Sequence, residues 1–210
     1  MGYKLICFDL DDTLIREIHS VMLPCILNGK EAEHAVIQAR EDAGELTYIE
    51  ADYLRATLLA GLAEREIDAH FLRVAKPLRG IAETVRALHG HGILCFILTV
   101  GPIQVARTAA AVWGFDGCAG SEYEVADGVF TGKILSYSKS EHKVDRLNEL
   151  CIRHGIPPAE CVAVGDGATD LPVFAHCGAS IALNASEQVK RGATYAVDTE
   201  DLRDILRFII

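Results

Sequence analysis

Two aspartates separated by one residue, Asp9 and Asp11, follow a short apolar run from Leu5 to Phe8. Such a run is typical of a strand buried on both faces of a sheet, and alternation along it lets both carboxylates leave its end on one side. Ligands of open α/β sheets bind outside the carboxyl ends of strands. Because each carboxylate raises the pKa of the other, the pair favours a bound cation. The structural alternative is that Asp-Asp-Thr caps a helix or forms a turn.

A hydroxyl side chain, Thr99, follows a second apolar run at 93–98 and precedes Pro102, which is typical of the first turn of a helix. The N-terminus of a helix offers backbone N–H groups and a positive dipole end to a phosphate. Thr99 can therefore bind a phosphoryl oxygen at the end of a buried strand, or it can simply cap the helix. The residues alone leave both functions open.

The stretch 162–170 indicates a strand, a glycine-rich turn and a helix start. We expect Gly165 and Gly167 to adopt backbone angles that other residues resist, which brings Asp166 to the rim of the sheet. Asp170 comes four residues later, on the same side of the new helix. Mg²⁺ is held by a few carboxylates together with water and phosphate oxygens, so Asp166 can join Asp9 in binding it. The alternative is a Gly-Asp-Gly turn that binds no ligand.

A lysine, Lys143, lies near the start of a predicted helix at 140–154, beside the apolar residues Leu147 and Leu150. A lysine at the edge of a buried face either extends its ammonium to solvent or neutralises a buried anion. Lys139, one turn earlier, is the alternative to Lys143 in the second role.

Strands and helices alternate from Pro77 onwards, which favours a parallel, doubly wound α/β sheet. Besides the first strand, the predicted strands are 93–98, 161–164, 179–183 and 195–197, with a hairpin of 123–125 and 129–134 around Asp127-Gly128. The predicted helices of this part are 80–90, 102–113, 140–154, 169–176 and 201–209.

The segment between the first strand and Pro77 contains no convincing strand and is predicted to be helical, at 18–27, 31–43, 49–62 and 68–74. One apolar stripe there consists of Leu54, Leu58, Leu59 and Leu62. We therefore predict two domains: an α/β core of residues 1–15 and 77–210, and a small helical cap of residues 16–76 inserted after the first strand.

Composition excludes several classes of function. The chain of 210 residues has a formal net charge of −10, which argues against a nucleic-acid partner, since that partner needs a basic face. No apolar stretch is long enough to span a membrane, and acids follow the first apolar run too closely for a signal peptide. The seven cysteines form no C-x-x-C pair, so we expect no zinc and a cytoplasmic protein. We expect a monomer or a homodimer.

The loop with the two aspartates resembles the D-x-D-x-T-L motif of the haloacid dehalogenase-like (HAD) hydrolases; its sequence is Asp9-Leu10-Asp11-Asp12-Thr13-Leu14. The other signals follow in that family's order, and the spacing from Lys143 to Asp166 resembles the phosphoserine phosphatase branch. The resemblance implies a HAD-type Rossmann-like core and a phosphatase. Asp9 is then the nucleophile that becomes an aspartyl-phosphate, and Asp11 is the general acid and base.

The same resemblance implies Mg²⁺ as cofactor, held by Asp9, the backbone carbonyl of Asp11 and Asp166, with Asp170 behind them orienting Lys143 or a metal-bound water. The core residues that it implies for substrate binding are Thr99, Gly101, Lys143 and Thr169. The acid at position 11 favours phosphate chemistry over dehalogenation, and an enzyme over a protein that only binds a phosphorylated ligand.

This sequence also departs from the phosphoserine phosphatase pattern. That branch usually has two glycines after its second-motif hydroxyl, where this chain has Thr99-Val100-Gly101, and an Asn at the position of Thr169. Its cap supplies a Glu and an Arg for the serine amino and carboxyl groups; Glu17 and Arg55 are the nearest residues, each one position away. We expect a small phosphorylated metabolite as substrate, with phosphoserine, a sugar phosphate, a cofactor phosphate and a phosphonate as the alternatives.

Overall fold

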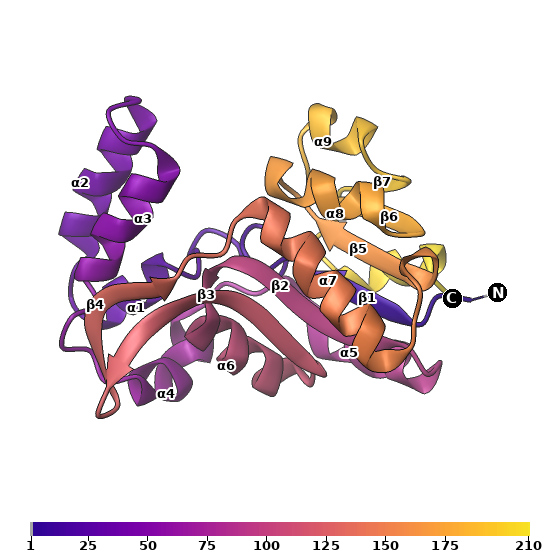
Figure 1. Cartoon of the computed structure of the whole chain (residues 1–210), viewed down its shortest axis with the longest axis horizontal. Coiled ribbons are helices and arrows are strands. Elements are labelled where there is room, and N and C mark those ends of the chain that lie inside the picture. The colour runs from indigo at the N-terminus through magenta and orange to yellow at the C-terminus, as the bar shows by residue number, and fades with distance from the viewer. Residues whose placement is uncertain (1) are drawn as a thin grey trace.

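The computed structural model describes residues 2–210, and a seven-stranded sheet in the order β4-β3-β2-β1-β5-β6-β7 forms its centre (Figure 1). All neighbouring strands pair in parallel except the antiparallel β3 and β4. The strands are β1 (Leu5–Phe8), β2 (Leu94–Pro102), β3 (Gly117–Ala126), β4 (Val129–Ser136), β5 (Cys161–Gly165), β6 (Ala179–Leu183) and β7 (Tyr195–Val197). The chain leaves β1 on one side and later returns as β5 on the other, so β1 and β5 flank the switch point where such sheets bind ligands.

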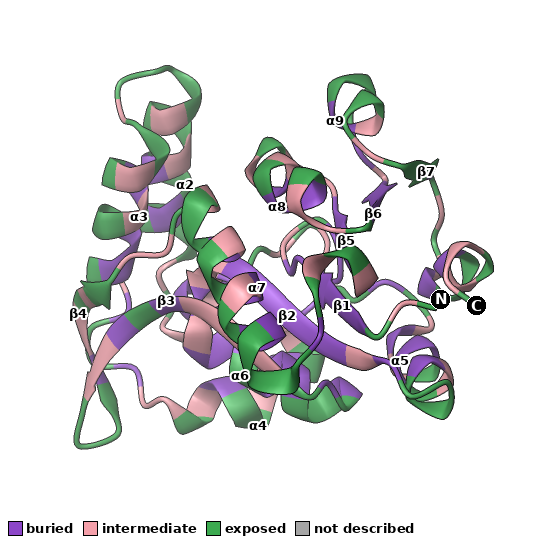
Figure 2. Cartoon of the chain, turned by 45° about the vertical axis from the view of Figure 1, so that its right-hand side comes forward, coloured by how far each residue is buried: buried purple, intermediate pink, exposed green. Residues whose placement is uncertain are grey.

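Helices cover both faces of the sheet, which confirms the predicted doubly wound fold. Leu5 and Cys7 of β1 face a core closed by α7 (Ser140–His154), α8 (Leu171–His176) and α9 (Glu187–Arg191). Ile6 and Phe8 point to the other face, where the core is closed by α5 (Ile81–Gly90), α6 (Ile103–Trp113) and the 3₁₀-helix η3 (Leu202–Phe208). In Figure 2, α7 crosses in front of the buried strand β2. Both cores exist because β1 is apolar at every position.

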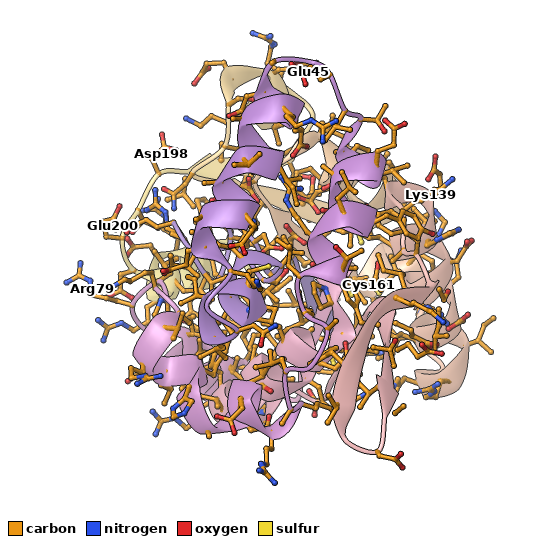
Figure 3. All side chains as sticks on the ribbon, turned by 90° about the vertical axis from the view of Figure 1, so that its left-hand side faces the viewer. Glu45, Arg79, Lys139, Cys161, Asp198 and Glu200 are labelled. Carbon is orange, nitrogen blue, oxygen red and sulfur yellow. The ribbon has the colours of Figure 1, made fainter. Side chains whose placement is uncertain are left out.

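Four helices lie between β1 and α5 in the chain: α1 (Met22–Leu27), α2 (Glu31–Asp42), α3 (Tyr48–Thr57) and α4 (Arg65–Val74). No strand lies among them, as predicted. The helix α4 packs against α6, with the rings of Phe71 and Trp113 5.3 Å apart. The pair α2 and α3 stands away from β5–β7, above the β3–β4 hairpin, and Figure 3 shows Glu45 at the outer end of this pair.

The hairpin at Asp127-Gly128 is confirmed, because both residues adopt the positive φ values, 50° and 77°, that its tight turn requires. The predicted bounds of the strand before it are wrong. β3 begins at Gly117 and pairs with β2 in parallel over a stretch that the sequence did not indicate. That stretch, Gly-Cys-Ala-Gly, contains no β-branched or aromatic residue, so its strand conformation comes from pairing with β2 rather than from its own preference.

The predicted leucine stripe is also partly wrong. The helix α3 ends at Thr57, and Leu54 is exposed while its neighbour Arg55 is buried. Ion pairs with neighbouring acids allow the burial of Arg55, which an apolar periodicity does not reveal. No helix among residues 2–210 is both long and apolar enough to cross a membrane.

Candidate active site

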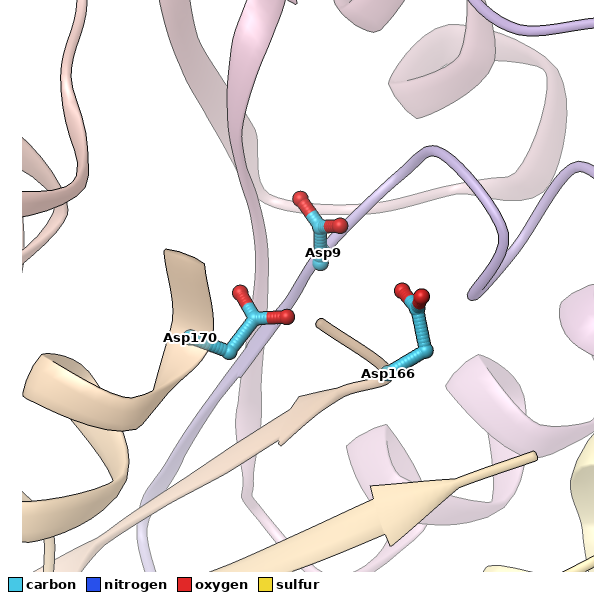
Figure 4. A group of neighbouring side chains, drawn as sticks. All are labelled: Asp9, Asp166 and Asp170. Atoms are coloured by element: carbon cyan, nitrogen blue, oxygen red, sulfur yellow. The ribbon is translucent and has the colours of Figure 1, made fainter. Parts of the chain in front are cut away.

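Three carboxylates converge at the switch point of the sheet (Figure 4). Asp9 follows β1 and Asp166 follows β5, and these strands are parallel neighbours, so their carboxyl ends meet. Asp170 ends the short 3₁₀-helix η2 (Ala168–Asp170). One oxygen from each of the three lies within 4.8 Å of the others. Clustered carboxylate oxygens are the ligands that a hard cation such as Mg²⁺ prefers, so the residues present fit that ion.

The ammonium of Lys143 lies between two of these carboxylates. Its Nζ donates to Asp9 Oδ1 at 2.7 Å and to Asp170 Oδ1 at 2.6 Å. Burial by itself lowers the pKa of Lys143, but the charges of Asp9 and Asp170 outweigh it and raise that pKa, so the lysine stays protonated. Lys139, the alternative in the sequence, is exposed and lies at the periphery of the molecule in Figure 3.

Asp170 approaches the backbone so closely that one glycine is required. A Cβ atom added to Gly165 would lie 2.3 Å from Asp170 Cγ. Asp170 Oδ2 also accepts the N–H of Gly167 at 3.2 Å. The expectation that Gly165 and Gly167 adopt unusual backbone angles is wrong, because neither has a positive φ. The reason for a glycine at position 165 is contact with Asp170 rather than backbone conformation.

Asp166 is held by a residue to which the sequence assigned no role. Thr13 is fully buried, and its Oγ1 donates to Asp166 Oδ1 at 2.8 Å. Burial raises the pKa of Asp166 to about 6, although the hydrogen bond from Thr13 lowers it. The signal for Thr13 in the sequence is its place as the Thr of the D-x-D-x-T-L motif.

Asp11 forms its hydrogen bonds with Ser20, just before the first of the inserted helices. The backbone N–H of Ser20 donates to Asp11 Oδ1 at 2.5 Å, and the Ser20 hydroxyl donates to Oδ2 at 2.6 Å. Burial raises the pKa of Asp11, and the bonds from Ser20 oppose that rise. A carboxyl with a raised pKa suits a general acid near neutral pH. Ser20 was not predicted, since nothing in the local pattern links it to Asp11.

The second loop contributes Thr99 and Gly101. Thr99 is buried within β2, because that strand runs on to Pro102 rather than ending at 98 as predicted. Thr99 Oγ1 accepts the N–H of Gly101 at 3.0 Å. A Cβ atom on Gly101 would lie 2.1 Å from Ser20 Oγ and 3.2 Å from Asp11 Oδ2, so only glycine fits there. The structure therefore brings Gly101 against Asp11.

The remaining predicted residue of the core, Thr169, is half-buried in η2 between Asp166 and Asp170. Its hydroxyl lies close to Gly167, since a Cβ atom added to that glycine would be 3.7 Å from Thr169 Oγ1. Thr169 thus belongs to the turn that carries both aspartates.

A cavity of about 230 Å³ opens beyond Asp11, between the loops of the core and the helices α2 and α3. Its lining includes Asp11, Ser20, His34, Glu41, Asp52 and Arg55. The cavity is smaller than typical sites for drug-sized ligands, so it suits a small leaving group. Of the two predicted cap residues, the structure brings Arg55 to this cavity and does not bring Glu17, which is exposed and lines a different cavity beside Arg79 and Glu200.

Several polar residues of this cavity were missed in the sequence. His34, Gln38 and Glu41 are spaced i, i+4, i+7 and therefore share one face of α2. That polar stripe is the signal that could have revealed them. Asp52 and Arg55, three residues apart on α3, meet this face.

A family model and individual relatives of known name place the chain in the same family. The model of the haloacid dehalogenase-like hydrolases matches residues 6–175. The phosphoserine phosphatase of Idiomarina loihiensis is 31% identical over 204 residues, covering 96% of this chain and 91% of that protein. The phosphoserine phosphatase of Halobacterium salinarum is 35% identical over 202 residues, covering 94% and 93%.

Solved structures similar to this chain belong to the same family as the relatives found by sequence. A phospho-aspartyl intermediate analogue of phosphoserine phosphatase matches over 100% of both chains with a TM-score of 0.82 and 28% identity. A substrate-bound phosphoserine phosphatase complex matches over the same extent with a TM-score of 0.82 and 27% identity. The chain therefore belongs to the haloacid dehalogenase-like hydrolases and is a phosphatase of the phosphoserine phosphatase branch.

Proposed function

We propose that this phosphatase hydrolyses the phosphate monoester of a small metabolite through a covalent aspartyl-phosphate on Asp9. The observation that supports the proposal best is the position of Asp9, which Lys143 contacts at 2.7 Å beside Asp166 at the switch point. Phosphoserine, the compound in the names of the relatives, is one member of this class of substrates. Its fit depends on the residues around the cavity beyond Asp11.

In the first step Asp9 attacks phosphorus in line, and the bond to the leaving-group oxygen breaks as Asp11 protonates that oxygen. In the second step Asp11 takes a proton from water, which attacks the aspartyl-phosphate and releases phosphate and Asp9. Lys143 and Thr99 would donate to the equatorial phosphoryl oxygens, where charge must be stabilised in both steps. Gly101 and Thr169 would contact the phosphoryl group from the ends of their loops.

Mg²⁺ would be held by Asp9, the backbone carbonyl of Asp11 and Asp166, and when bound it neutralises charge on the phosphoryl oxygens. We assign Asp170 to a position behind these ligands. Both of its oxygens already accept hydrogen bonds, from Lys143 and from the N–H of Gly167, so its role is to position Lys143.

Residues 16–76 would act as the cap over this site. The helices α2 and α3 provide one wall of the cavity beyond Asp11, and the core provides the other. A cap in this place excludes bulk water from the aspartyl-phosphate and contacts the leaving group, while the core binds the phosphoryl group.

The proposal is tested with p-nitrophenyl phosphate, assayed with Mg²⁺, with EDTA and after Mg²⁺ is restored. We expect hydrolysis that is lost with EDTA and recovered with the metal. Turnover in metal-free buffer would contradict the assignment of Mg²⁺. The alternative function, binding of a phosphorylated ligand without catalysis, predicts no turnover of any phosphate ester under the same conditions.

A further inference from the structure

The guanidinium of Arg55 is already neutralised by neighbouring acids. Its Nη1 donates to Asp52 Oδ1 at 3.0 Å, and its Nη2 donates to Glu41 Oε2 at 2.5 Å and to Gln38 Oε1 at 2.7 Å. The side chain of Arg55 is only 5% exposed, whereas those of Glu41 and Asp52 are 22% and 15% exposed. Two carboxylates therefore neutralise one guanidinium, and the carboxylates are more accessible to a ligand than the guanidinium is.

The charge at the outer end of the cavity is consequently negative. Two acids, Glu41 and Asp52, face the single positive charge of Arg55. Burial raises the pKa of Asp52, while the hydrogen bond that Tyr137 donates to its Oδ2 at 2.6 Å and the contact with Arg55 favour its ionised form. Burial and the nearby Arg55 lower the pKa of His34, so this histidine adds no positive charge near neutral pH. His19 is paired with the carboxylate of Asp12 at 3.0 Å. Among the described residues that line the cavity, no cation is left without an acidic partner.

Two residues that line the cavity each have a buried polar atom with no hydrogen-bond partner among residues 2–210, so each has hydrogen-bonding capacity left for a ligand. These atoms are Nε2 of His34 and Nε of Arg55, and the two residues are 6% and 4% exposed. In a neutral imidazole one ring nitrogen accepts a hydrogen bond, so Nε2 of His34 can receive one from an ammonium group. The Nε–H of Arg55 can donate to a neutral oxygen of the leaving group.

Resting on the proposed phosphatase function, we propose that this cavity selects an amino-alcohol phosphate, whose leaving group carries an ammonium and no carboxylate. The ammonium would lie against Glu41 and Asp52, with His34 as a further acceptor. A carboxylate on the same carbon skeleton would add a negative charge beside Glu41 and Asp52, and Arg55 would offer it only one N–H. Leaving groups with an ammonium alone are therefore preferred over amino acids.

The test separates the two charges by using four phosphate monoesters with Mg²⁺. Ethyl phosphate has neither group, O-phosphoethanolamine has the ammonium, 3-phosphooxypropionate has the carboxylate, and O-phosphoserine has both. We expect kcat/KM for O-phosphoethanolamine to exceed that for ethyl phosphate and for O-phosphoserine by about tenfold each, with 3-phosphooxypropionate the poorest. A value for O-phosphoserine equal to or above that for O-phosphoethanolamine would overturn the proposal.

Binding of the same compounds to the Asp9→Asn protein, measured by calorimetry, separates this inference from the phosphatase function. If no ester is hydrolysed by the wild-type protein but O-phosphoethanolamine still binds about tenfold more tightly than O-phosphoserine, the catalytic proposal fails and the ligand preference stands. If esters are hydrolysed but the binding constants of these two compounds are equal, the preference fails and the phosphatase function stands.

A variant tests the role of Glu41. In Glu41→Gln the outer end of the cavity loses one negative charge, so we expect kcat/KM for O-phosphoethanolamine relative to ethyl phosphate to fall about tenfold. The value for O-phosphoserine relative to O-phosphoethanolamine should rise. Glu31→Gln is the matched control, since Glu31 is exposed on the same helix and does not line the cavity, and it should leave both ratios within about twofold. Unchanged ratios in Glu41→Gln would contradict the assignment.

Discussion

The Nζ atom of Lys143 lies 2.7 Å from Oδ1 of Asp9, and the two side chains are 2% and 9% exposed. Asp170 binds the same ammonium at 2.6 Å. Two buried carboxylates thus share one buried cation, and each depends on it, because an unpaired buried charge is costly. The proposed nucleophile and the stability of the core therefore depend on the same ion pairs.

Removing the cation should destabilise the protein strongly. We expect Lys143→Met to lower the free energy of unfolding by about 3–5 kcal/mol, since it leaves Asp9 and Asp170 buried without a counter-charge. Urea denaturation followed by circular dichroism measures the change, and added Mg²⁺ should recover part of it. Lys139→Met, on an exposed neighbour, should change stability by less than about 0.5 kcal/mol. Equal effects of both substitutions would contradict the assigned ion pairs.

Asp9→Asn should abolish turnover and leave the fold intact. The amide cannot act as the nucleophile, so we expect below about 1% of wild-type kcat with p-nitrophenyl phosphate. Lys143 keeps Asp170 as its partner in this variant, and unfolding should therefore remain cooperative. Beryllofluoride, which mimics a phosphoryl group on an aspartate, should bind the wild-type protein and not the variant. Residual activity above that level would remove Asp9 from the nucleophile's role.

The stability of the metal-free protein should depend on Asp166 in a pH-dependent manner. Burial raises the pKa of Asp166 to about 6, so the stabilising effect of its protonated form is present below about pH 4 and is lost as the pH rises through 6. In EDTA, Asp166→Asn should raise the free energy of unfolding at pH 8, by on the order of 1–3 kcal/mol, and should not change it at pH 4. Thermal unfolding at both pH values is the measurement. With Mg²⁺ present the wild-type protein should be more stable than Asp166→Asn, because the variant loses a metal ligand.

Ser20→Ala should shift the pH profile of catalysis. The hydroxyl of Ser20 donates to Asp11 and favours its ionised form, so its loss raises the pKa of Asp11. Because the first step needs protonated Asp11, the alkaline limb of kcat/KM should move up by roughly 0.5–1 pH unit, the equivalent of one hydrogen bond. A limb that stays in place or moves down would show that Asp11 is not the acid held by Ser20.

Two neighbouring glycines should respond differently to alanine. Gly165→Ala places a Cβ atom 2.3 Å from Asp170 Cγ, so we expect a loss of about 1–3 kcal/mol in stability together with displacement of Asp170. Gly167→Ala meets no atom closer than 3.7 Å and has an ordinary backbone conformation, so its stability should change by less than about 1 kcal/mol. Chemical denaturation of both variants distinguishes this contact from a shared need for glycine flexibility.

The sequence by itself determined much of the core and the positions of its acids. The uninterrupted apolar run before Asp9 required a strand covered on both faces, and Asp127-Gly128 required a tight hairpin. The helical periodicity around Lys143 placed that lysine beside a buried face, but the edge position that it predicted is wrong, because the structure buries Lys143 to 2% exposure. These features are local, since strand alternation, helix period and turn residues each act over a few positions.

Only the tertiary structure decided which partners the polar groups have. Lys143 meets Asp9 across 134 positions, and Thr13 meets Asp166 across 153, distances over which no local pattern carries information. Arg55 is buried although the leucine stripe predicted Leu54 in that position, because Glu41 and Asp52 neutralise the guanidinium. Glu17 lines another cavity. The first half of β3 forms a strand because β2 offers hydrogen-bond partners. Ion pairing, close packing and sheet pairing are properties of the folded chain, so they appear only when distant segments meet.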